Sequence, residues 1–289
     1  MQFVIHIIIS AIIFALLASG FKFFIKLKWN LDFSYMAIVI FSSYLSALLN
    51  IHFGIWIIMA IVISFLVSIG FTFLVLFLSK RLNDVYFTIG TLSLYVLVYQ
   101  LAYNMESITW WALGLSLTNR TLIWWISVST LNSFLVFGGV LIALIIWWLV
   151  YFKKTYFYKT LMWWGEREFV VKSLWVKIDI YKFGMILVTT LLASLAWWLY
   201  AFYYLYIDPS TFWFTMLVPV LVIVFLSYKR NDWWTLIISL LVMFAYEYLR
   251  FFKIVEPSKI WYFREMMFWL IIVVVSFIVF RKTNFGREN

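Results

Sequence analysis

Long apolar segments follow one another along most of the chain, and this pattern limits the possible folds more than any other feature. The segments are residues 3–21, 31–49, 53–78, 85–103, 121–152, 183–207, 211–228, 233–249 and 266–280. A helix needs about 20 apolar residues to cross the hydrocarbon core of a bilayer. Backbone polar groups in that core must be satisfied within the protein, which favours helices. The sequence therefore predicts an all-α fold, a polytopic transmembrane helical bundle with about 8–10 membrane segments.

Composition excludes several classes of protein. The chain is 66% hydrophobic and only 12% charged, whereas soluble domains carry about 25% charged residues. It has no cysteine, and His6 and His52 lie in no metal-ligand motif. We find no Ser-His-Asp order and no glycine loop that could hold a phosphate. We therefore expect no enzymatic activity, no catalytic residue, no cofactor and no metal site.

Basic residues predict how the bundle is oriented. If the N-terminus is outside, loops that face the cytoplasm hold 17 of the 22 lysines and arginines. Membrane proteins concentrate Lys and Arg on the cytoplasmic side, so the net charge of +10 needs no nucleic-acid partner. Residues 1–21 have no basic segment before the apolar run, so we expect a retained span. The interval 153–182 and the C-terminal tail are then predicted to be cytoplasmic.

The interval 153–182 is the one long polar stretch between apolar segments. It holds seven Lys or Arg residues and three acids. Apolar residues recur in it at helical spacing: Leu161, Trp164, Val171, Leu174, Trp175 and Ile178, with Glu166 and Glu168 among them. Two interpretations stay open. The interval is either a charged cytoplasmic tether or an amphipathic helix that docks on a soluble partner and receives force from it.

No acidic residue lies at the middle of an apolar segment. Carriers driven by protons or sodium usually place ionisable groups at the bilayer midplane. Any energy for transport should therefore come from another protein. A secondary solute carrier and a membrane scaffold without an ATPase partner remain the alternatives.

Three stretches, in the same order, carry a family pattern. In residues 81–115 it includes Arg81, Tyr86, Thr91, Thr109 and Gly114, and in the central interval Glu166, Glu168, Leu174, Tyr181 and Lys182. In residues 194–212 it includes Asp208 and Pro209. Together these stretches resemble the permease subunits of branched-chain amino acid ABC importers, the LivM/LivH type.

The resemblance implies a single transmembrane permease domain over residues 1–289, in an ATP-driven importer for branched-chain or other amino acids. The implied partners are ABC ATPase subunits that bind the ATP, a second permease subunit, an extracytoplasmic substrate-binding protein and the lipid bilayer. Residues 153–182 would be the cytoplasmic coupling loop, with Leu161, Glu166, Glu168, Val171, Leu174 and Ile178 facing the ATPase. The implied location is a bacterial inner membrane.

Tryptophan stands where the family pattern has glycine. The positions are Trp110, Trp111, Trp175 and Trp197, and the chain holds 18 tryptophans but only 10 glycines, against about 20 glycines from average usage. An indole in a closely packed glycine position costs about 1–3 kcal/mol through overpacking. Our hypothesis is that many of these tryptophans are UGA codons in a source that reads UGA as glycine.

Overall fold

The computed structural model describes residues 2–28, 32–82, 84–105, 114–117, 121–123, 126–127, 130–166, 173, 177–228, 230–249 and 260–284. The helices are α1 (Gln2–Lys28), α2 (Ser34–Phe53), α3 (Ile57–Arg81), α4 (Asp84–Asn104), α6 (Leu131–Phe152), α7 (Tyr156–Glu166), α9 (Ile178–Tyr204), the 3-10 helix η2 (Pro209–Phe212), α10 (Phe214–Ser227), α11 (Asp232–Tyr248) and α12 (Ile260–Asn284). Short strands β1 (Leu115–Ser116) and β4 (Tyr206–Ile207) pair, as do β2 (Thr121–Ile123) and β3 (Ile126–Ser127).

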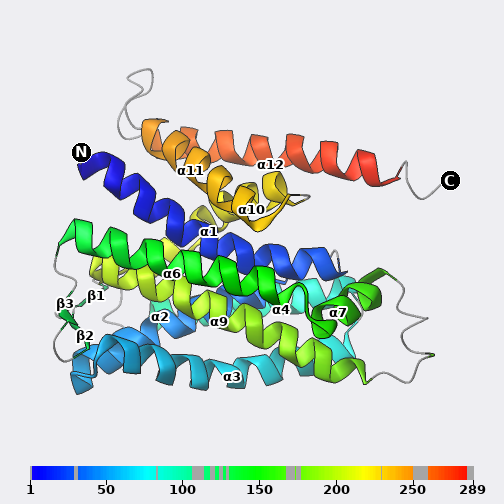
Figure 1. Cartoon of the computed structure of the whole chain (residues 1–289), viewed down its shortest axis with the longest axis horizontal. Helices are drawn as coiled ribbons and strands as arrows, with labels where there is room; N and C mark the ends of the chain where they lie inside the picture. The colour runs from blue at the N-terminus through cyan, green and yellow to red at the C-terminus, as the bar shows by residue number, and fades with distance from the viewer. Residues whose placement is uncertain are drawn as a thin grey trace.

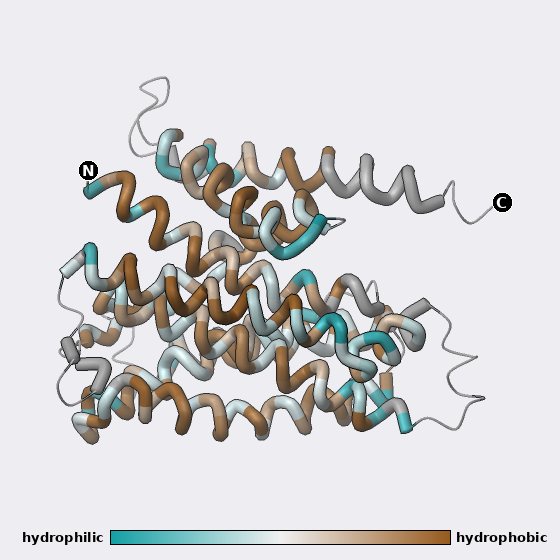
Figure 2. The backbone as a smooth tube through the Cα atoms, viewed as in Figure 1, coloured by the Kyte–Doolittle hydropathy of each residue, from teal (hydrophilic) through white to brown (hydrophobic). Residues whose placement is uncertain are grey.

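The described helices confirm the all-α polytopic bundle. Every predicted apolar segment carries one of the long helices, which run side by side in Figure 1. Seven described helical segments are long and apolar enough to cross a membrane by length and composition. The N-terminus lies at one end of the bundle and α7 at the other (Figure 1), and we call these the N-terminal end and the α7 end. Hydrophobic residues dominate the middle of the helices, and hydrophilic residues gather toward their ends (Figure 2).

The predicted fifth span, residues 121–152, is wrong in its first third. Strands β2 and β3 occupy part of it, and α6 begins only at Leu131. Thr130 caps α6, because its hydroxyl accepts the N–H of Ser133 at 3.2 Å while the Ser133 hydroxyl contacts the N–H of Thr130. This reciprocal cap satisfies donors that the first helical turn leaves open, so the helix starts there.

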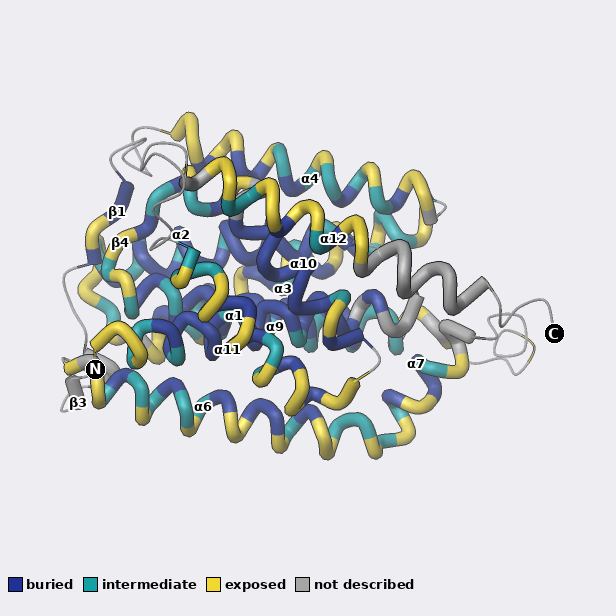
Figure 3. The backbone as a smooth tube through the Cα atoms, turned by 90° about the horizontal axis from the view of Figure 1, so that it is seen from above, coloured by how far each residue is buried: buried dark blue, intermediate teal, exposed yellow. Residues whose placement is uncertain are grey.

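Helix α9 lies at the centre of the bundle and packs against α1, α2 and α3 (Figure 3). Three small residues of α2, Ser42, Ser43 and Ser46, lie at these close contacts. All three serines are buried in an unbroken α2. Each hydroxyl donates to a backbone carbonyl three residues earlier. Such small, internally bonded side chains let membrane helices approach closely.

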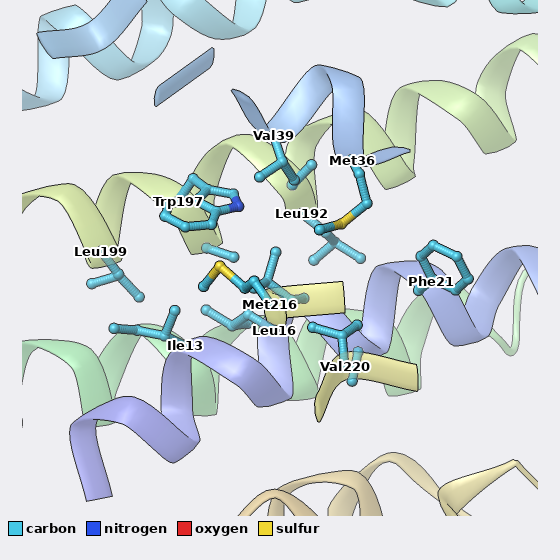
Figure 4. Packing of buried hydrophobic residues seen from close by; sticks show 14 of the residues in the cluster. Ile13, Leu16, Phe21, Met36, Val39, Leu192, Trp197, Leu199, Met216 and Val220 are labelled. Atoms are coloured by element: carbon cyan, nitrogen blue, oxygen red, sulfur yellow. The ribbon is translucent and has the colours of Figure 1, made fainter. Parts of the chain in front are cut away.

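Trp197 lies in the middle of this core (Figure 4), and it is fully buried. Its ring centroid is 4.5 Å from that of Phe212 and 4.3 Å from that of Tyr200. The indole N–H finds no hydrogen-bond acceptor, and the same is true of the neighbouring Trp198. A buried donor without a partner costs about 1–3 kcal/mol. Two adjacent indoles in this condition fit the hypothesis that glycine belongs at one of these positions.

The coding DNA tests that hypothesis directly. We expect UGA codons at Trp110, Trp175 and Trp197, because these positions fall on glycines of the family pattern. UGG codons at all three positions would reject the hypothesis.

Asp32 lies two residues before α2 and is buried despite its charge. Its Oδ1 accepts the backbone N–H of Ser34 at 2.9 Å, and the Ser34 hydroxyl also donates to it. Burial raises the pKa of this carboxyl from 3.8 to about 6, and the hydrogen bonds from Ser34 oppose that shift only in part. The folded chain therefore binds this proton more tightly than the unfolded chain does.

This raised pKa predicts that stability falls as the pH rises between the unfolded value of 3.8 and the folded value of about 6. In that window the folded state binds more protons than the unfolded state, so raising the pH favours unfolding. The effect is at most about 3 kcal/mol. Asp32→Asn keeps an oxygen for Ser34 but removes the charge.

Thermal melts in lipid nanodiscs near pH 4 and near pH 7 measure the effect. The difference between the two melting temperatures should shrink in Asp32→Asn, and the variant should be the more stable protein at neutral pH. An identical pH dependence in both proteins would show that Asp32 does not contribute to it.

Candidate functional site

A cavity of about 800 Å³ lies in the half of the bundle nearer the N-terminal end. Residues of α1, α4, α9, η2, α10 and α11 line it. Its most prominent side chains are five tyrosines and one acid: Tyr99, Tyr103, Tyr200, Tyr204, Tyr246 and Glu247. Hydroxyls of Ser10, Ser210 and Thr211 add further polar groups. A cavity of this size with a few polar groups is typical of a small-molecule site.

The described wall of this cavity carries a single charged side chain, Glu247. Arg264 of α12 contacts one of the wall residues, because its guanidinium carbon lies 3.6 Å from the centroid of the Tyr246 ring. Gln100 also lines the cavity, and its side-chain oxygen accepts a hydrogen bond from Asn104 of the same helix at 3.1 Å. The cavity was not predicted, although pairs of tyrosines four residues apart on α4 and α9 were visible in the sequence.

At the α7 end, α7 rests on the chain's own helices. Leu161 is fully buried in a cluster with Phe23 of α1. Phe157 lies over Gly184 of α9, where a Cβ would sit only 2.4 Å from the ring. The same ring stacks on Tyr181, with centroids 4.9 Å apart. Glycine at position 184 therefore permits the close contact between the two helices.

Our expectation that a partner protein covers Leu161 is wrong. Leu161 belongs to a buried cluster with residues of α1, α3, α4 and α9, so this leucine anchors α7 within the chain. The opposite face of α7 is open: Tyr156 is 76% exposed, Trp163 is 65% exposed, and Lys159 between them is exposed as well. These three residues, spaced at i, i+3 and i+7, share one face of the helix. We call them the exposed stripe of α7, and they were not predicted from the sequence.

Ionic contacts connect the elements at the α7 end. Lys153 follows α6, and its Nζ donates to Oδ1 of Asp232, the first residue of α11, at 2.6 Å. Lys22 of α1 is buried, and it donates to the carbonyl of Arg230 at 3.0 Å and to the hydroxyl of Thr235 at 2.9 Å. The turn between α10 and α11 is thereby tied both to α1 and to the connection between α6 and α7.

The residues of the family pattern are only partly brought together. Gly114 and Asp208 flank the paired strands β1 and β4, and Gly114 takes a φ of 65° with a Cβ position only 2.6 Å from the carbonyl of Ile207. Asp208 accepts the N–H of Ser210 at 3.0 Å, and Pro209 begins η2. These contacts shape the η2 wall of the cavity.

The other pattern residues serve separate places in the bundle. Thr91 is buried, and its hydroxyl accepts the N–H of Phe33 at 3.3 Å. Tyr86 is exposed, and Arg81 ends α3 with its guanidinium 5.2 Å from the ring of Phe77. Outside the described residues lie Thr109, Trp110, Trp111, Glu168, Val171, Leu174 and Trp175. Glu166 is the last residue of α7, and Ile178 is the first residue of α9.

Within the described residues, no group of three His, Cys, Asp or Glu side chains could hold a metal ion. The site thus consists of the tyrosine-lined cavity, the seat of α7 on α9, and the ionic contacts at the α7 end.

Comparison with known proteins agrees with this membrane architecture. A family model described as "Branched-chain amino acid transport system / permease component" matches residues 3–275. No curated protein and no solved structure matches the chain significantly. Because the family match extends over nearly all of the sequence, the chain belongs to the permease-component family of branched-chain amino acid transport systems.

Proposed function

We propose that this chain is the transmembrane permease subunit of an ATP-driven importer for branched-chain or other amino acids. The observation that carries the proposal is the family match over residues 3–275. The proposed partners are ABC ATPase subunits, a second permease subunit and an extracytoplasmic substrate-binding protein. The proposed location is the inner membrane of a bacterium, with the α7 end in the cytoplasm, where the excess of basic residues favours it.

The cavity and α7 suit the two tasks of such a subunit, which are to accept the solute and to contact the ATPase. The cavity lies toward the N-terminal end, where a binding protein would deliver the solute. The helix α7 lies at the opposite end and presents the exposed stripe of Tyr156, Lys159 and Trp163. We propose that this stripe, together with Glu166, Glu168, Val171, Leu174 and Ile178 of the interval 153–182, contacts the ATPase.

Helix α9 offers a direct route between these two places. Its first turns carry Tyr181 and Gly184, on which α7 is seated. Its last turns carry Tyr200 and Tyr204, which line the cavity. When ATP-driven closure of the ATPases displaces α7, the packed α9 would shift the wall of the cavity. No side chain in this scheme is catalytic, and ATP is bound only by the ATPase subunits.

The exposed stripe yields the test of this proposal. Tyr156→Ala should reduce copurification of the ATPase and ATP-dependent uptake of L-leucine, because truncating a central interface aromatic typically costs about 2 kcal/mol or more, roughly 30-fold in affinity. Tyr151→Ala is the matched control. Tyr151 is 64% exposed on α6 and outside the stripe, so its truncation should leave both measurements unchanged.

Uptake is measured in cells after ATP depletion and, separately, after collapse of the proton gradient. Uptake that survives ATP depletion but stops with the gradient would identify a secondary carrier and reject the proposal. Full copurification and uptake in Tyr156→Ala would show that the stripe is not the ATPase contact.

The Lys153–Asp232 pair yields a second test. Asp232 is only 8% exposed and Lys153 is 24% exposed in their side chains, so losing one partner leaves a poorly solvated charge. Lys153→Asp and Asp232→Lys should each lower uptake per ATP hydrolysed, and the double exchange should restore a large part of it.

The exposed Lys80–Asp179 pair, at 2.8 Å, is the control for charge exchange. Exposed pairs contribute about 0–1 kcal/mol, so exchanging these two charges should change little. A double exchange at Lys153 and Asp232 that is as impaired as the worse single variant would contradict a direct role of the pair.

A further inference from the structure

The tyrosine-lined cavity shows which end of a solute it can recognise. The rings of Tyr200 and Tyr204 lie 4.4 Å apart, and those of Tyr99 and Tyr103 stack at 6.2 Å. Tyrosine faces attract cations through the negative charge of the π system. Tyr246 already does so, because it holds the guanidinium of Arg264 at 3.6 Å. The wall is therefore rich in surfaces that suit a positively charged group.

The charges around the cavity have the same preference. Glu247 lines it, and Asp208 caps η2, whose Ser210 and Thr211 belong to the wall. Among the described residues at this end of the bundle, the basic side chain beside the wall is Arg264. Its guanidinium lies against the ring of Tyr246, and Glu265 follows it in the sequence. A cation entering the cavity meets one acid, Glu247, and several aromatic faces, whereas an anion meets no basic side chain among the described lining residues.

Helix α10 contributes a proline to the wall of the cavity. Pro219 lies inside this helix and lines the cavity. Proline has no N–H, so the carbonyl of Thr215, four residues earlier, lacks its usual helical donor. The N-terminus of α10 would favour an anion through its dipole. However, Met216 is the residue of that first turn that lines the cavity, and its N–H already donates to the carbonyl of Trp213 at 3.1 Å. This N–H is therefore not open to an anion in the cavity.

We propose that the cavity binds the ammonium group of the transported solute, held between tyrosine faces and Glu247, and that it makes no ionic contact with the solute's carboxylate. The inference rests on the proposed function in that it takes the solute to be an amino acid. It adds that the amine alone suffices for recognition at this place, while the carboxylate does not.

Three molecules that share one side chain test the inference: L-leucine, 3-methylbutylamine, which lacks the carboxylate, and 4-methylpentanoate, which lacks the amine. Binding is measured by equilibrium dialysis of the radiolabelled compounds against the purified full chain in nanodiscs. We expect saturable binding of 3-methylbutylamine, competition by L-leucine, and no competition by 4-methylpentanoate.

Glu247→Gln should weaken binding of the amine on the order of tenfold, because it removes the one charged partner in the wall. Asp179→Asn is the matched control, since it removes one carboxylate on the exposed surface at the α7 end. It should leave amine binding unchanged. The comparison of amine with acid uses the unmodified chain and therefore does not depend on how well a variant folds.

Binding of the acid without the amine, or binding of neither compound, overturns the inference. An amine affinity that Glu247→Gln leaves intact in a folded protein also overturns it. ATP-dependent uptake of L-leucine without amine binding would reject this inference and leave the proposed function standing. Amine binding that depends on Glu247, in a protein whose uptake does not require ATP, would reject the proposed ATP-driven function and leave this inference standing.

Discussion

Close contact between α9 and its neighbours is the interaction on which the rest of the structure depends. Lipid tails are as apolar as leucine, so membrane helices associate through packing and hydrogen bonds rather than through the hydrophobic effect. Helix α9 meets this requirement with buried Ala193, Ser194 and Ala196, and Thr190 bonds Thr72 of α3 at 3.2 Å. At one end this helix seats α7, and at the other it supplies tyrosines to the cavity. A bulky residue at the α9 interface would therefore disturb both places together.

The two ends of the bundle differ in the charged side chains that they carry and in the partners of those side chains. At the α7 end, Lys22 is buried and Lys153 is half-buried, and each donates to a specific oxygen of the α10–α11 turn or of α11. At the N-terminal end, acids border a cavity whose polar groups are mostly hydroxyls. The first arrangement fixes elements relative to one another, since a buried charge without its partner is costly. In the second, the described wall of the cavity combines one acid with several hydroxyls and aromatic rings, which is typical of a site that binds a small molecule.

Much of the fold could be predicted from the sequence, and the predictions that were wrong failed for physical reasons. Hydropathy located the spans because length and apolarity are local properties. It could not separate the strands at residues 121–127 from α6, since a short apolar run with Thr, Ile and Trp suits a strand as well as a helix; the caps at Thr130 and Ser133 held the missing signal. Periodicity showed that Leu161 must be buried but not that the chain's own helices bury it. The cavity could not be predicted, because its tyrosines come from α4, α9 and α11 and meet only after folding.

The contact of Phe157 with Gly184 has a mechanical consequence. Long, flexible side chains between two helices transmit motion poorly, because a rotamer change absorbs part of any displacement before the second backbone moves. Here an aromatic ring rests directly on backbone, and its face is fixed by stacking on Tyr181. The contact between α7 and α9 therefore resists compression, because almost no side-chain movement can absorb a displacement of α7 toward α9. It resists pulling far less, because only van der Waals contact holds the ring in place, so α7 transmits a push to α9 more faithfully than a pull.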